Sequence, residues 1–140
     1  MNARRGAARL AFVVLAGCYA SNVVAPEQRL VAADVAQLVW QPADASSLDG
    51  YFVSVDLQGE AAASLRCVYY VFVPGGRYTG AALADVDGEL SFQTLRGTWQ
   101  LGPDGLALDD TAPVRCEQAP GHLRLTAPNG VVVLRRERLP

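Results

Sequence analysis

The stretch that decides the fold is residues 122–135, which read HLRLTAPNGVVVLR. Two apolar runs flank a Pro-Asn-Gly sequence at residues 128–130. Asn-Gly between such runs is the strongest short-range signal for a hairpin, because both residues tolerate the positive φ angles of a tight turn. We therefore expect residues 122–126 and 131–135 to pair as antiparallel strands.

Other segments of the chain carry similar strand signals. Residues 51–58 alternate between two sets of side chains, one largely apolar, and residues 65–73 (LRCVYYVFV) are rich in β-branched and aromatic residues. Further short strands are expected at residues 77–80, 90–94, 97–101, 106–108 and 114–118. Because turns recur about every 8–12 residues and no helical pattern separates the strands, we expect an all-β domain, an antiparallel barrel or sandwich of about seven or eight strands.

One short helix is expected before these strands. Pro26 suits the first turn of a helix, and apolar residues follow it at helical spacing, namely Val31, Val35 and Leu38. This helix would end before Pro42; alternatively, residues 38–40 open the first strand. Residues 60–63 (EAAA) are expected to form a helical turn or a loop.

Length and composition narrow the class of protein. The 140 residues suffice for one domain, and 51% of them are hydrophobic against 19% charged, which excludes a disordered charged tail. The net charge is −2, so the chain has no overall basic character of the kind that nucleic-acid binding requires. One histidine and three cysteines leave little material for a metal site, and we expect no metal and no cofactor.

The N-terminus has the features of a secretion signal. Three arginines precede a short apolar run, residues 10–16, which is shorter than the roughly 20 residues of a membrane-spanning helix. Residues 15–18, Leu-Ala-Gly-Cys, resemble the lipobox of bacterial lipoproteins. In that family the cysteine thiol receives a diacylglycerol and the chain is cut just before it, so the resemblance implies a signal peptide at residues 1–17 and lipidation of Cys18.

Lipidation of Cys18 implies a protein anchored in the bacterial cell envelope. Residues 18–26 would then form a lipidated tether, and residues 27–140 a single β-rich domain. Tyr19 follows the cysteine where lipoproteins retained at the inner membrane of enteric bacteria carry Asp, so we expect the outer membrane. Three of the 12 basic residues leave with the signal while all 14 acidic ones stay, so the remaining chain has a net charge of −5. The expected partner is the membrane, through acylated Cys18, and not nucleic acid.

The turns of residues 50–136 resemble a known kind of β domain. A strand with Gly76-Arg77-Tyr78 is followed by Gly97-Thr98-Trp99, then Gly105-Leu106-Ala107-Leu108, and finally the Asn-Gly hairpin. This order is similar to that of small lipocalin-like barrels of envelope lipoproteins, including the N-terminal domain of the copper-stress lipoprotein NlpE. That domain carries a Cys-x-x-Cys motif that this chain lacks, so the resemblance implies the architecture and not a copper-related role.

Three aromatic residues are candidates either for the core or for a ligand site. Trp99 is expected to close one end of the barrel, with Gly97 allowing the strand to bend or to pack closely against the ring. Tyr69 and its neighbour Tyr70 must face opposite sides of their strand, so one of them is available for a barrel mouth or a partner. Tyr78 is the third candidate.

Cys67 and Cys116 remain once Cys18 is lipidated, and an even pair in an oxidising compartment predicts a disulfide between them. The open alternative is two buried free thiols, because strand register decides whether the two Cα atoms come within about 7 Å.

Catalytic signals are weak throughout the sequence. His122 is the only imidazole, and a Cys–His nucleophile would need it beside Cys67 or Cys116. The serines lack a Gly-x-Ser-x-Gly setting, and residues 85–89 and 109–110 are interpreted as solvated turns. We therefore expect no catalytic residue and a non-enzymatic binding or structural module, which holds a small apolar ligand or contacts an envelope protein. The alternative is an inhibitor or accessory subunit of an envelope enzyme or assembly complex.

Overall fold

Nine antiparallel strands joined in one continuous sheet make up most of residues 35–138, the part of the chain that the computed structural model describes. Their order across the sheet is β1-β7-β8-β9-β2-β3-β4-β5-β6. Two short helices, η1 (Ala45–Leu48) and α3 (Glu60–Ser64), interrupt them. The strands are β1 (Gln41–Pro42), β2 (Gly50–Gly59), β3 (Leu65–Val73), β4 (Arg77–Val86), β5 (Glu89–Gly102), β6 (Gly105–Leu108), β7 (Arg115–Ala119), β8 (His122–Ala127) and β9 (Gly130–Glu137).

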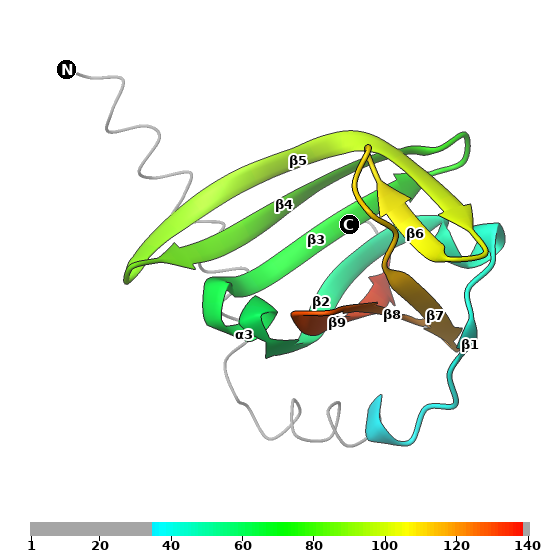
Figure 1. Ribbon diagram of the computed structural model, residues 1–140, viewed down its shortest axis with the longest axis horizontal. Coiled ribbons are helices and arrows are strands. Elements are labelled where there is room, and N and C mark those ends of the chain that lie inside the picture. Colours follow the sequence, from blue (N-terminus) through cyan, green and yellow to red (C-terminus); the bar gives the residue numbers. More distant parts are fainter. Residues whose placement is uncertain (1–34, 139–140) are drawn as a thin grey trace.

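The sheet curls on itself, so that β4 and β5 arch over β7, β8 and β9 (Figure 1). At one end the curl closes, because Leu106 in β6 and Val114 just before β7 exchange two backbone hydrogen bonds of 2.8 Å. Gly105 is required there, since it has φ +121° and a side chain on it would overlap the backbone of Val114. The predicted fold class, a small all-β antiparallel barrel, is confirmed in this half-open form.

Most of the predicted strands are confirmed, several with different ends. The predicted strand at residues 65–73 is β3, and the Asn-Gly hairpin joins β8 to β9 with Ala127 opposite Gly130. Residues 90–94 and 97–101, which we expected to be separate strands, form the single long strand β5. The ninth strand is β1, which pairs with β7 at the edge of the sheet. Pro42 is tolerated in this edge strand because no further strand requires the N–H group that proline lacks.

The N-terminal helix falls mostly outside the described residues. Val35 and Ala36 are helical, and residues 38–40 are neither helix nor strand, so the alternative of a first strand at those residues is wrong. Residues 60–63, for which we expected a helical turn or a loop, lie in helix α3. Strand β2, which precedes this helix, has a bulge directly after Ser54. The buried hydroxyl of Ser54 accepts a 3.0 Å hydrogen bond from the Val68 amide of the neighbouring strand β3.

Alternation along the strands separates an inner face from an outer face. The inner side chains pack into one apolar cluster whose largest buried members are Phe52, Phe72, Leu48, Leu106, Leu123 and Leu134. On the outer face of β3 and β4, Cys67 and Leu83 form a second, small cluster with Tyr69 against it. Tyr69 and Tyr70 therefore face opposite sides, as predicted, since Tyr70 packs on the inner cluster.

Candidate functional site

The three aromatic candidates do not meet in one site. Trp99 packs on the inner cluster, edge-on to Phe72 with ring centres 6.3 Å apart, and its indole N–H donates to the Val73 carbonyl at 3.2 Å. Tyr78 is buried in the same cluster, with its ring centre 6.0 Å from that of Tyr70. Tyr69 lies on the outer face and stacks on Tyr51 with ring centres 6.1 Å apart. Trp99 and Tyr78 thus belong to the inner apolar cluster, and Tyr69 belongs to the outer face.

Gly97 makes room for a carboxylate and not for the Trp99 ring. A side chain on Gly97 would overlap the carboxylate of Asp109, which accepts from the Tyr78 hydroxyl at 2.9 Å and from the Thr98 amide at 3.0 Å. Burial, followed by the hydrogen bond with Asp109, raises the pKa of Tyr78 to about 12. Asp109 is exposed in a turn, as expected, and its carboxylate is in addition held by two strand residues, Tyr78 and Thr98.

The disulfide predicted between Cys67 and Cys116 is not formed. Cys116 is a free, buried thiol of the inner cluster, whereas Cys67 lies on the outer face of the sheet. The two side chains leave the sheet on opposite sides, which no adjustment of rotamers can bridge. Burial and the neighbouring Glu117 raise the pKa of the Cys116 thiol to about 12. The lipidation residue Cys18 lies outside the described residues.

His122 does not form a pair with Cys116. It opens β8 opposite Ala119, three positions along the ladder from the Cys116–Leu125 pair, which is a separation of about 10 Å. Its Nδ1 instead lies 2.9 Å from the Pro120 carbonyl. Within residues 35–138, no three His, Cys, Asp or Glu side chains are placed to hold a metal ion. The turn at residues 87–88 is closed by Asp85, whose carboxylate accepts from the Gly88 amide.

A buried ion-pair cluster that the sequence did not single out lies on the outer face of β7 and β8. The Glu117 side chain is only 8% exposed, and its two oxygens bind different arginines. Oε1 accepts from Arg115 at 2.8 Å, and Oε2 accepts from Nε of Arg124 at 2.7 Å. The two arginines therefore supply the charge-assisted hydrogen bonds that replace water around this buried carboxylate.

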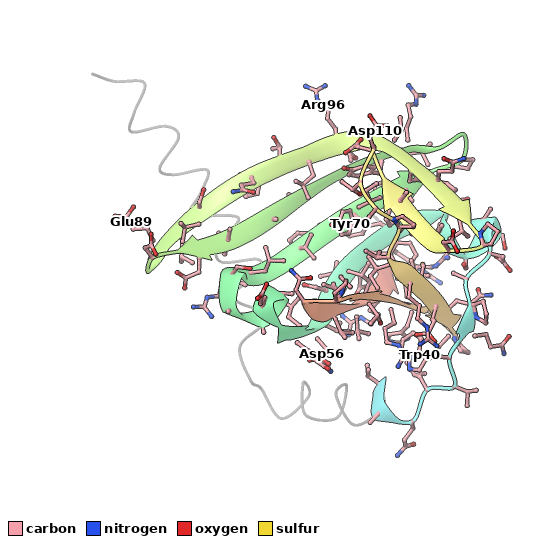
Figure 2. The ribbon with its side chains drawn as sticks, in the orientation of Figure 1. Trp40, Asp56, Tyr70, Glu89, Arg96 and Asp110 are labelled. Carbon is pink, nitrogen blue, oxygen red and sulfur yellow. The ribbon has the colours of Figure 1, made fainter. Side chains whose placement is uncertain are left out.

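Trp40 extends this cluster into a groove. The guanidinium of Arg124 lies over the Trp40 ring at 4.5 Å from its centre, between Glu117 and the indole. The groove has a volume of about 430 Å³, with Arg115 and Arg124 on one side and Asp56 and Gln58 of β2 on the other. Figure 2 shows Trp40 and Asp56 on the lower, outer side of the sheet, away from the inward-pointing Tyr70.

The chemistry that this groove offers is recognition. Its fixed groups are guanidinium, carboxylate, carboxamide and indole, and the bottom is apolar through Val131 and Val133. Arg115 is exposed and has guanidinium N–H groups to spare for a ligand, because only one of its nitrogens binds Glu117. Asp56 is already tied to Gln58 by a 2.7 Å hydrogen bond, so the opposite wall is also ordered. In the sequence, Arg115, Glu117 and Arg124 alternate with apolar residues, which indicates that their side chains lie on the outer face of their strands. The register of β7 against β8 is needed to show that Glu117 and Arg124 lie opposite each other.

No helix in residues 35–138 is long and apolar enough to cross a membrane. The comparisons with known proteins leave the family open: no protein-family model, no curated protein and no solved structure matches this chain.

Proposed function

We propose that this chain is a lipid-anchored, non-enzymatic module of the bacterial cell envelope that contacts another envelope protein through the groove around Trp40 and Arg115. The observation that carries the proposal is the ion-pair cluster of Glu117, which holds Arg124 against Trp40 and leaves Arg115 exposed beside them. Tryptophan and arginine are the residues most enriched among those that dominate the energetics of protein interfaces. Pre-ordered side chains also lose less conformational entropy on binding.

The charges of the groove favour an extended peptide segment as the bound part. Arginine side chains on one wall match an acidic group of the partner, while Asp56 on the other wall matches a basic one. The apolar floor accepts a side chain between them. A small apolar ligand inside the barrel is the less favoured reading, because the inner space is occupied by the side chains of one packed cluster. An accessory subunit of an envelope complex is a specific form of the same proposal.

The anchor rests on the sequence. The basic start, the short apolar run and the lipobox ending at Cys18 together imply acylation, and two or three acyl chains give stable membrane attachment where one is marginal. Incorporation of labelled palmitate into the expressed full chain tests this part. Loss of the label in Cys18→Ser is the expected result, and label that persists in this variant would overturn the anchor.

The groove is tested by site-specific photo-cross-linking in cells. A photo-reactive amino acid at Gln58, in the groove, is expected to give a cross-linked product with one protein. The same group at Arg77, an exposed residue at the start of β4, is the control. Arg115→Glu should abolish the product at residue 58. A product of equal yield at both positions, or one that survives the charge reversal, contradicts the proposal.

A further inference from the structure

The floor of the groove consists of two straight rows of side chains. Each row crosses four neighbouring strands, β2, β9, β8 and β7, in the order in which they pair. Residues directly opposite each other in antiparallel strands share a face, so each row lies on the outer face with the ion-pair cluster. One row consists of Asp56, Val133, Arg124 and Glu117, and the other of Gln58, Val131, Thr126 and Arg115. All eight residues line the groove.

The two ends of this floor carry opposite charge. At the β7 end, Glu117 is bound by Arg115 and Arg124, so the ion-pair cluster has one positive charge in excess. At the β2 end, Asp56 is the only charged residue among the described residues that line the groove, and its hydrogen bond goes to the uncharged Gln58. Figure 2 shows Asp56 and Trp40 apart from each other along the lower, outer side of the sheet. A ligand that matches the whole floor therefore has a basic group at one end and an acidic group at the other.

The separation of these two ends sets the length of the ligand. Three strand spacings of about 4.8 Å lie between β2 and β7, which is a distance of about 14 Å. An extended peptide advances about 3.4 Å per residue, so four residues cover this distance. Its side chains alternate, so residues i, i+2 and i+4 all point toward the floor. A basic residue at one end then reaches Asp56, an acidic residue four positions away reaches Arg115, and the residue midway lies over Val131 and Val133.

We propose that the groove binds an extended peptide that runs across the strands and carries a basic and an acidic residue four positions apart, with an apolar residue midway. This inference rests on the proposed function of the groove and adds the spacing of the side chains that are recognised. Arg115 receives the acidic side chain because it is 72% exposed, whereas Arg124 is 30% exposed and lies between Glu117 and Trp40. A spacing of three or five residues would turn one of the two charges away from the floor.

Synthetic peptides that differ in the spacing and sign of their charges test this pattern. A fluorescein-labelled peptide that contains Lys-Thr-Val-Thr-Glu is titrated with the purified full chain in mild detergent, and fluorescence anisotropy measures binding. The reversed peptide, Glu-Thr-Val-Thr-Lys, covers the opposite chain direction. We expect the better of these two to bind about fivefold more tightly than Lys-Thr-Val-Glu, whose charges are three positions apart, and than Lys-Thr-Val-Thr-Lys.

A change of charge in the groove separates specific recognition from general adhesion. Asp56→Lys should weaken binding of the preferred peptide and make Glu-Thr-Val-Thr-Glu the tighter ligand, because the β2 end of the floor then attracts an acidic group. Glu89→Lys, which replaces an acidic residue by lysine at an exposed position of β5 outside the groove, should leave both affinities unchanged. Equal binding of all the peptides, or a preference that Asp56→Lys does not reverse, overturns the proposed pattern.

Failure of this inference can be told apart from failure of the proposed function. If the photo-reactive group at residue 58 gives its Arg115-dependent product while the peptides show no preference, the groove contacts a partner but the pattern is wrong. If no such product forms, the proposed function of the groove is itself contradicted.

Discussion

The hydroxyl group of Tyr78 in β4 donates a 2.9 Å hydrogen bond to the carboxylate of Asp109, which follows β6. The same carboxylate accepts from the Thr98 amide in β5 and occupies the space that a side chain on Gly97 would need. One acidic residue thus joins two strands and the loop that leads to the closing contact of Leu106 and Val114. Asp109 adopts φ 56° to do so, a conformation that aspartate tolerates better than most residues.

Gly97→Ala is expected to destabilise the domain by about 1–3 kcal/mol, because the new methyl group overlaps the Asp109 carboxylate. Urea denaturation measures the loss. Gly102→Ala is the matched control, since nothing lies within 4 Å of the added atom and the residue is in the same strand. In a chain that already carries Asp109→Ala, the cost of Gly97→Ala should largely disappear. Equal costs in both backgrounds would show that Asp109 is not the obstacle.

Alkaline pH should weaken the fold through Tyr78. Its pKa is raised from the ordinary 10 to about 12, mainly by burial and then by Asp109, so the folded state holds the phenolic proton more tightly than the unfolded state. The stability that Tyr78 contributes is therefore fully present below pH 10 and is lost as the pH rises through 12. The chain has no lysine, so none titrates in this range. Tyr78→Phe should make the decline in unfolding free energy shallower between these pH values, and an unchanged slope would contradict the assignment.

The sequence was sufficient for the fold class because its signals were local. Residues 65–73 and the Asn129-Gly130 turn carry strand and hairpin preferences that neighbouring residues determine. The continuity of β5 was missed because Gly97 was interpreted as a bend, whereas it serves a contact with a residue 12 positions later. Such a contact leaves no trace in local patterning.

The cysteine pairing and the groove were not predictable for the same reason. Whether Cys67 and Cys116 can meet depends on which face of the sheet each occupies, and a one-residue change of register would exchange those faces. Glu117, Arg124 and Trp40 come from two neighbouring strands and the segment before β1, so only the folded sheet places them together.

The free Cys116 thiol should be chemically silent in the folded protein. It is buried in the inner cluster, and its pKa of about 12 keeps the reactive thiolate scarce at neutral pH. Alkylation followed by peptide mass analysis should label Cys116 within minutes in denaturant without a reducing agent, and only very slowly in its absence. If labelling in denaturant required a reducing agent, Cys116 would belong to a disulfide and its assignment as a free thiol would be wrong.

Glu117 should be the most sensitive charged residue of the domain. Glu117→Gln removes the charge that both arginines bind and leaves Arg124 with a weaker acceptor, for an expected loss of about 1.5–3 kcal/mol in urea denaturation. Arg115→Ala should cost less than about 1 kcal/mol, because that side chain is 72% exposed and its ion pair is largely solvated. Glu89→Gln, an exposed glutamate on β5, controls for the loss of one negative charge and should stay within about 0.5 kcal/mol of the parent.

The same Glu117→Gln variant should also release the Arg124 guanidinium from the Trp40 ring, which a change in indole fluorescence would report. If Glu117→Gln and Glu89→Gln proved equally mild and the fluorescence stayed constant, the ion-pair cluster could not be what orders the groove.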